Sequence, residues 1–304
     1  MRFSLTLPTD RVDQPEQFLT AAAVMEMASA LETIGADACH VTDHPFPPQA
    51  FVDGGGHHAL DPMVALSFAA AATARLELHT NVFIPTYRNP FVAAKAVATL
   101  DVLSGGRVIL GVAAGYLEEE FAACGAQFEQ RGVTLDSHIA AMRMAWSGAP
   151  VIAEGSGWRS SGNVMLPTPL RPIPIWIGGN SASAMRRAVR LGDGWSPFPA
   201  SSRTAGVLRT VPLASLEDLR KALDGMDQEV ERIGRRSAPE VCLTPFSHPH
   251  HRPTLDPARL VDEALELEAL GVRWLAVRLP GDDRRSFLSS IERFGESVIR
   301  RLNP

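Results

Sequence analysis

An aspartate and a histidine are adjacent in the segment Val41-Thr42-Asp43-His44-Pro45. Histidine titrates near neutral pH, and a neighbouring carboxylate can set its tautomer or its charge. The pair therefore suits proton transfer or polarisation of a bound cofactor. An aspartate that caps a turn beside a surface histidine is the alternative, and the dipeptide alone leaves both open.

A glycine turn joins the apolar segment Ile175–Ile177 to a helical segment that begins near Ser183. The turn reads Gly178-Gly179-Asn180-Ser181. Free backbone N–H groups and the positive end of a helix dipole together form an anion site, so this turn is a candidate phosphate cradle. A short structural turn is the alternative.

Two further segments follow apolar runs. Asn81-Val82 precedes a stretch stiffened by Pro85 and Pro90, and asparagine tolerates unusual backbone angles. The run Ala113-Ala114-Gly115-Tyr116 has small residues that would let a flat ligand approach the backbone, with an aromatic face beside them. A plain connecting loop and tight packing are the respective alternatives.

Histidines also cluster in two loop segments. His248, His250 and His251 lie in a proline-rich stretch without a further ligand at metal-site spacing, which favours a solvated loop and no metal. His57 and His58 follow Gly54-Gly55-Gly56, and a glycine-hinged loop there could gate a pocket.

Composition narrows the function classes. The formal net charge is −5 and there is no cluster of Lys and Arg, so we expect no nucleic-acid partner. No apolar run approaches the roughly 18 residues of a membrane span. Three distant cysteines fit neither a disulfide framework nor a metal site, which is typical of a cytoplasmic protein. They are Cys39, Cys124 and Cys242.

The elements that must position these residues alternate between apolar strands and helices along the whole chain. About eight strands alternate with helices, which predicts an α/β fold, a (β/α)8 TIM barrel, rather than the alternative doubly wound sheet. We expect one domain over residues 1–304, with an insertion at about 150–174 on the C-terminal face. The expected strands cover 2–7, 38–42, 76–83, 108–112, 175–177, 194–196, 240–244 and 274–278.

Taken together, the motifs resemble the luciferase-like monooxygenase superfamily, in its F420-dependent oxidoreductase branch. The resemblance covers roughly residues 1–200 and is strong as a set, whereas the last third matches only in its rhythm of helices and strands. The motifs are TDHP at 42–45, GGGHHALDP at 54–62, TNVFIPTYRNP at 80–90, LDVLSGGRVILGVAAGYLEEEF at 100–121 and PIWIGGNSASAMRRAVRLGDGW at 174–195.

The resemblance implies roles for individual residues. Asp43 and His44 would lie beside the deazaflavin ring, with His44 handling a proton. Asn81-Val82 would form a non-proline cis peptide behind the ring. Ala114, Gly115 and Tyr116 would line the cofactor, and Gly178, Gly179 and Asn180 would receive its phosphate. Glu119 stands where some relatives carry an amide that contacts the cofactor, which leaves its role open.

The resemblance also implies an activity. The favoured reading is an F420-dependent oxidoreductase that transfers a hydride between the deazaflavin and a small organic substrate. The alternatives are an FMN-dependent monooxygenase that uses reduced flavin and O2, and a cofactor-binding carrier or sensor. We expect the substrate pocket to be walled by residues 46–60, 150–170 and 197–212, and a homodimer is common among such proteins.

Overall fold

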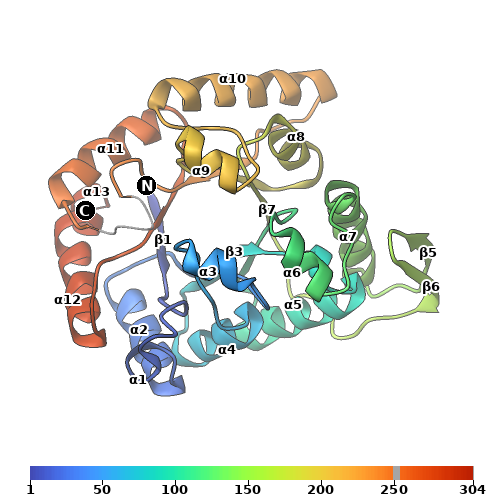
Figure 1. Cartoon of the computed structure of the whole chain (residues 1–304), viewed down its shortest axis with the longest axis horizontal. Coiled ribbons are helices and arrows are strands. Elements are labelled where there is room, and N and C mark those ends of the chain that lie inside the picture. The colour runs from blue at the N-terminus through green and yellow to red at the C-terminus, as the bar shows by residue number, and fades with distance from the viewer. Residues whose placement is uncertain (249–253, 304) are drawn as a thin grey trace.

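Eight parallel strands close into a barrel in the computed structural model, which describes residues 1–248 and 254–303. The strands follow the order β1-β10-β9-β8-β7-β4-β3-β2 around the barrel, and helices surround it (Figure 1). The predicted barrel is confirmed, and the doubly wound sheet is wrong, because β1 and β2 pair and close the sheet. The strands are β1 (Arg2–Thr6), β2 (Ala38–Val41), β3 (Glu77–Phe83), β4 (Val108–Val112), β7 (Ile175–Gly178), β8 (Gly194–Ser196), β9 (Glu240–Leu243) and β10 (Trp274–Val277).

Alternate residues of these strands point inward and outward, as the period of two requires. The outward side chains pack under the helices in the main hydrophobic core. Close packing inside the barrel demands glycine at Gly194, because a Cβ there would lie 2.3 Å from the Trp176 ring. The apolar inward layer consists of Ala38, Ile109, Trp176, Cys242, Trp274 and Ala276.

The helices begin and end at the residue types that favour those positions. Asp61 caps α4 by accepting hydrogen bonds from the N–H groups of Met63 and Val64. The principal helices are α2 (Ala21–Thr33), α4 (Pro62–Ala72), α5 (Pro90–Ser104), α7 (Arg131–Trp146), α8 (Ala182–Leu191), α10 (Leu216–Ile233), α11 (Pro257–Ala269) and α12 (Arg284–Phe294). Short elements are α1 (Pro15–Phe18), α3 (Gln49–Asp53), η1 (Pro85–Tyr87), α6 (Glu118–Ala123), α9 (Ser202–Val207), η2 (Gly295–Ile299) and α13 (Arg300–Leu302).

The insertion forms an antiparallel hairpin of β5 (Val151–Gly155) and β6 (Trp158–Asn163), which lies beside α7 (Figure 1). The indole N–H of Trp158 donates to Ser137 Oγ of α7 at 3.0 Å, and its ring packs edge-on against Phe91 at 5.2 Å. The hairpin therefore packs its Trp158 side chain against the outer helices α5 and α7.

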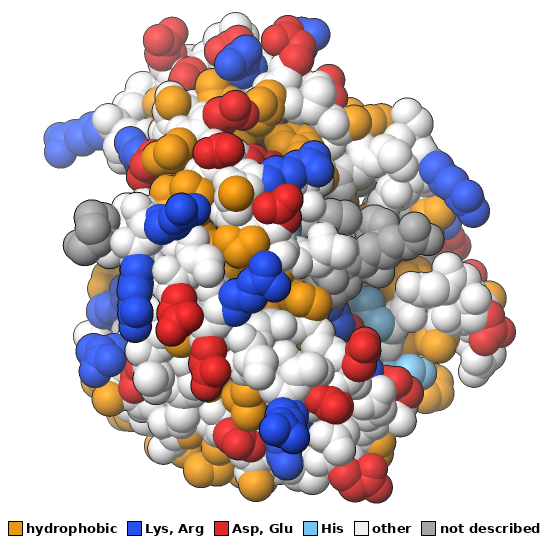
Figure 2. Space-filling model, turned by 90° about the vertical axis from the view of Figure 1, so that its left-hand side faces the viewer, with side chains coloured by type: hydrophobic (Ala, Val, Ile, Leu, Met, Phe, Trp, Pro, Cys, Tyr) orange, Lys and Arg blue, Asp and Glu red, His pale blue; other side chains and the backbone are white. Residues whose placement is uncertain are grey.

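No helix in the described ranges is long and apolar enough to cross a bilayer. On the face that carries α11 and α12, basic and acidic side chains are interspersed and form no continuous basic area (Figure 2).

Candidate functional site

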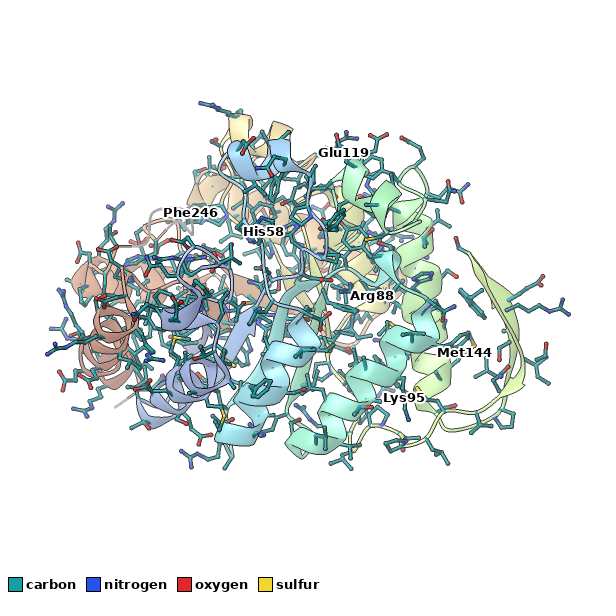
Figure 3. The ribbon with its side chains drawn as sticks, turned by 60° about the horizontal axis from the view of Figure 1, so that its bottom comes forward. His58, Arg88, Lys95, Glu119, Met144 and Phe246 are labelled. Atoms are coloured by element: carbon teal, nitrogen blue, oxygen red, sulfur yellow. The ribbon has the colours of Figure 1, made fainter. Side chains whose placement is uncertain are left out.

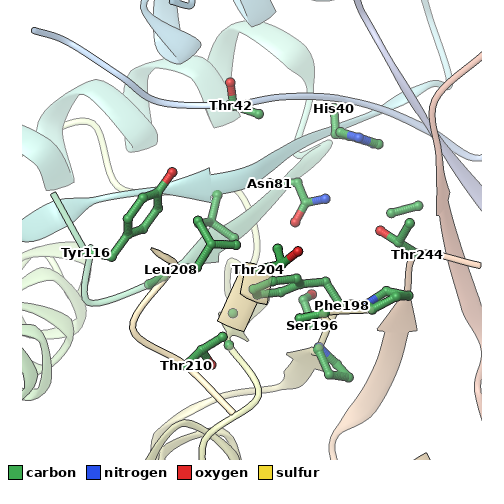
Figure 4. A pocket seen from close by; sticks show the side chains of 18 of the residues that line it. His40, Thr42, Asn81, Tyr116, Ser196, Phe198, Thr204, Leu208, Thr210 and Thr244 are labelled. Carbon is green, nitrogen blue, oxygen red and sulfur yellow. The ribbon is translucent and has the colours of Figure 1, made fainter. Parts of the chain in front are cut away.

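A cavity of about 1390 Å³ opens at the carboxyl ends of the barrel strands, where barrel enzymes build their active sites. Its volume exceeds the roughly 300–1,000 Å³ of a single ligand pocket. Asn81 lies near its centre and Tyr116 and Thr244 on opposite sides (Figure 4). The cavity can therefore hold an elongated cofactor together with a second small molecule.

His44, which follows β2, pairs with Glu120 of α6. Its Nδ1 donates to Glu120 Oε2 at 3.1 Å, and the same carboxylate accepts the N–H of Phe46 and the hydroxyl of Tyr87. Burial raises the pKa of Glu120, but the hydrogen bonds from His44, Phe46 and Tyr87 outweigh burial and bring that pKa below its usual value. Glu120 is therefore a buried carboxylate that orients the His44 ring.

Asp43 is also paired, but with a different partner. Arg88 donates two hydrogen bonds to its carboxylate, at 2.7 and 2.9 Å, and the N–H of Ile84 donates a third at 2.9 Å. The Asp43 side chain is only 1% exposed. Asp43 thus ties the end of β2 to the loop after β3, through an ion pair that the sequence did not indicate.

Aromatic side chains separate His44 from the cavity. His57 packs edge-on against His44 with ring centroids 4.9 Å apart, and Phe51 and Tyr116 pack at 5.1 and 6.1 Å. The cavity lining includes His57 and Tyr116 but neither Asp43 nor His44. Burial and the neighbouring His44 lower the pKa of His57. His44 therefore lies behind the cavity wall, covered by the rings of His57 and Tyr116.

The end of β3 carries the irregularity that the sequence predicted. The Asn81-Val82 peptide is cis, and the pairing of β3 with β4 shifts between Thr80 and Phe83. Asn81 and Val82 both line the cavity. The prediction of a cis peptide at this position is confirmed.

Small residues form a flat wall beside this bulge. Ala114, Gly115 and Gly178 line the cavity together with Gly179. A Cβ on Gly178 would lie 3.0 Å from Val82, and a Cβ on Gly115, where φ is +84°, would lie 2.7 Å from Phe121. Contacts within the chain therefore require glycine at both positions, and the small side chains leave the backbone accessible to a flat ligand from the cavity.

The polar groups of the turn after β7 form hydrogen bonds with other parts of the chain. The N–H of Gly179 donates to Ser196 O, and that of Asn180 to Thr210 Oγ1, both at 3.2 Å. The Asn180 amide binds backbone groups of Phe198 and Val211, and Asn180 does not line the cavity. Asn180 thus holds the segment 197–212 in place.

Donors for an anion lie just beyond the turn. Ser181 caps α8, and Ser181 and Ser183 line the cavity at the start of this helix, where the first N–H groups lack helical partners. Arg131 lines the same end and stacks 4.0 Å above the Phe128 ring. In the described part of the chain Arg131 forms no ion pair, so it can pair with a ligand's negative charge.

At the opposite end, beside β1 and β10, the cavity is lined by Asp10, Arg11 and Arg278. Arg278 donates two hydrogen bonds to Asp10, at 2.6 and 3.0 Å. Arg11 donates to the carbonyls of Gly281 and Asp282.

A chain of polar side chains runs from the cavity floor into the barrel. Thr6 Oγ1 lies 2.7 Å from His40 Nε2, and Ser4 Oγ lies 3.0 Å from both His40 Nδ1 and His79 Nδ1. Burial lowers the pKa of His79 to about 3, so this ring is neutral. The sequence signal for this hydrogen-bonded network is a single polar residue at each of several positions within otherwise apolar strands.

The structure locates Glu119 and corrects the expectation for His248. Glu119, for which no role was assigned, is exposed on α6 (Figure 3). Its neighbour Glu120 is buried. The spacing indicated that Glu120 is buried. Counted from Leu117, Glu120 is at i+3 and Phe121 at i+4, so all three share one face of the helix. His248 is 1% exposed and bonds Ser247, so its expected solvated position is wrong; His250 and His251 lie outside the described residues.

The pocket walls are confirmed in part. Residues within 46–60 and 197–212 line the cavity. The expectation for residues 150–170 is wrong, because none of them lines it and their hairpin packs on α7 and α5 instead. In the described part of the chain, no three His, Cys, Asp or Glu side chains gather as a metal site would require.

Comparison with known families finds a match over residues 1–259 to the model described as luciferase-like monooxygenase. The chain is 30% identical over 308 residues to the F420-dependent glucose-6-phosphate dehydrogenase of Mycobacterium tuberculosis, covering 95% of this chain and 88% of that protein. The enzyme of that name from Gordonia bronchialis is 27% identical, with 92% and 94% covered.

Solved structures share the fold. Monooxygenase RslO1 from Streptomyces bottropensis superposes with a TM-score of 0.77 at 18% identity, covering 99% of this chain and 100% of that chain. An F420-dependent secondary alcohol dehydrogenase in complex with an F420-acetone adduct gives 0.73 at 17% identity, covering 98% and 99%.

Proposed function

This chain belongs to the luciferase-like monooxygenase family and is an oxidoreductase, and we propose that it transfers a hydride between coenzyme F420 and a small organic substrate. The observation that carries the proposal is the flat wall of Ala114, Gly115 and Gly178 facing Asn81-Val82 at the barrel mouth. A planar ring can lie against this wall because Ala114, Gly115 and Gly178 carry at most a methyl group.

The elongated cavity suits a cofactor with an anionic tail. Gly178 and Gly179 would lie along the tail, and the start of α8 with Arg131 would bind its phosphate. Arg209 also lies 4.6 Å from the Phe128 ring, but it is paired with Glu118 at 3.2 Å, so we assign the phosphate to Arg131. We assign Asn180 a positioning role, through the segment 197–212, rather than direct contact.

When bound, the deazaflavin supplies two electrons as hydride. The chain's own residues would supply the proton and its position. Glu120 holds the His44 ring through Nδ1, which leaves Nε2 as the atom that gives or takes a proton. Asp43, which directly precedes His44, fixes the backbone at this position through its ion pair with Arg88. Because His57 and Tyr116 stand between His44 and the cavity, we expect their side chains to shift when the ring binds.

Fluorescence titration of the purified protein with F420 and with FMN tests this proposal. We expect quenching of F420 fluorescence at micromolar concentrations, no comparable FMN binding, and loss of turnover but not of binding in His44→Ala. Binding of FMN alone would support the monooxygenase alternative, and unchanged turnover in His44→Ala would remove the proton-transfer role. A homodimer is part of the same proposal and is checked by light scattering.

A further inference from the structure

The two arginines at the β1/β10 end of the cavity are already committed to partners within the chain. Arg278 follows β10 and Asp10 follows β1, and β1 and β10 are neighbours in the barrel, with Leu5 opposite Val277. Both side chains are mostly buried, at 19% and 12% exposed. The bidentate pair in this setting has no net charge.

Arg11 is likewise occupied. It donates to Gly281 O at 2.9 Å and Asp282 O at 3.2 Å, stacks on Phe18 and lies 3.4 Å from Asp13. The hydrogen bonds from its guanidinium to these carbonyl oxygens therefore hold the loop after β10 in place. Among residues 1–248 and 254–303, this end of the cavity has no cation that lacks a partner in the chain.

The remaining wall at this end is apolar or weakly polar. Phe246, Leu279 and Phe287 supply apolar surface, and Thr244 supplies a hydroxyl-bearing side chain. Among the described residues, a phosphate ester placed here would meet only guanidinium groups that already donate to Asp10, to Asp13 or to backbone carbonyls, so it would lose hydration for little electrostatic gain. An uncharged molecule loses little, and the N–H groups of Arg278 that do not face Asp10 can donate to its oxygen.

We infer that this end is the substrate subsite, that it accepts an uncharged ketone or alcohol with an apolar body, and that Asp10 excludes anionic substrates by neutralising Arg278. The inference rests on the proposed function, which places the deazaflavin ring and its phosphate toward β4 and α8. It separates this chain from its relatives named as glucose-6-phosphate dehydrogenases, whose substrate is a phosphate ester.

The first test uses the wild-type protein with F420. Cyclohexanone with the reduced cofactor, cyclohexanol with the oxidised cofactor and glucose 6-phosphate with the oxidised cofactor are compared by the absorbance of F420. We expect turnover of the uncharged pair, with kcat/KM for glucose 6-phosphate at least about 100-fold lower. A kcat/KM for glucose 6-phosphate equal to or above that of the uncharged pair would overturn the inference.

The second test needs no cofactor. Inorganic phosphate is titrated calorimetrically into wild type, Asp10→Asn and the double variant Asp10→Asn/Arg278→Met. Both wild type and variants can bind phosphate near Arg131. Asp10→Asn should bind one additional phosphate, and the double variant should lose it. A folded Asp10→Asn that gains no site contradicts the inference.

The single variant Arg278→Met is an independent test that stays informative if Asp10→Asn fails to fold. With Asp10 present, removal of Arg278 should leave phosphate affinity unchanged, whereas a loss of affinity of about 10-fold would mean that Arg278 is free to bind anions in the wild type. Absence of F420 quenching would refute the proposed function, and the phosphate titrations would still decide the role of Asp10.

Discussion

The carboxylate of Glu120 binds the imidazole of His44 across 76 residues of sequence, at 3.1 Å between Oε2 and Nδ1. The Glu120 side chain is fully buried and that of His44 is 10% exposed, so water competes little for this hydrogen bond. A buried carboxylate in this position sets the tautomer of the imidazole and stabilises positive charge that develops on it.

Glu120→Gln should therefore reduce kcat by roughly 10²-fold or more, because the imidazole loses both its orientation and its counter-charge. The F420 dissociation constant should change by less than about threefold. Glu119→Gln, on the exposed face of the same helix, is the matched control and should retain wild-type kcat. Equal kcat values for the two variants would show that Glu120 is only structural.

Arg88→Met should lower the free energy of unfolding by roughly 3–5 kcal/mol, because it leaves the buried Asp43 carboxylate without a cationic partner. Chemical denaturation measures this change. Arg143→Met breaks the ion pair with Asp193, whose side chains are 43% and 49% exposed, and should cost no more than about 1 kcal/mol. If the two costs were similar, the buried pair would not anchor the loop after β3.

Arg131→Ala should weaken F420 binding by about 10- to 150-fold, since one charge-assisted hydrogen bond contributes about 1.5–3 kcal/mol. The loss should shrink as salt is raised, because screening weakens the wild-type contact. Fluorescence quenching gives both values. Arg186→Ala removes an exposed arginine of α8 that does not line the cavity, and it should bind F420 as the wild type does.

Gly111→Ala should destabilise the fold by at least about 1–3 kcal/mol or prevent it from forming. A Cβ at Gly111 would lie 2.0 Å from the backbone oxygen of Thr80, and backbone cannot move aside as a side chain can. Gly206→Ala is the control, since its Cβ meets nothing within 4 Å and alanine favours the helix α9. Thermal melts that rank Gly206→Ala below Gly111→Ala would contradict the packing described for β3 and β4.

His79 should make stability depend on pH. Burial lowers its folded pKa from 6.5 to about 3, so between these values the unfolded chain binds a proton that the folded chain does not. Stability is then lost as the pH falls below about 6.5, by up to about 1.4 kcal/mol per pH unit. Denaturation between pH 7 and 5 should show a smaller slope in His79→Gln, and His58→Gln, at an exposed site, should keep the wild-type slope. An unaltered slope in His79→Gln would contradict the buried neutral ring.

The sequence by itself determined the elements and the edge of the barrel where the site lies. Strand β4 has the predicted bounds, residues 108–112, because its apolar pattern is a local property of the chain. The sequence also singled out Gly115 and Gly178 at the ends of two strands, and both residues line the cavity.

Only the tertiary structure decided which side chains meet. The pairs His44 with Glu120, Asp43 with Arg88, and Asp10 with Arg278 join residues 76, 45 and 268 positions apart. Sequence spacing carries no information about such contacts, because they depend on how neighbouring strands bring their ends together. The closure of β1 against β10 brings Asp10 within hydrogen-bond distance of Arg278, and the resulting ion pair carries no net charge.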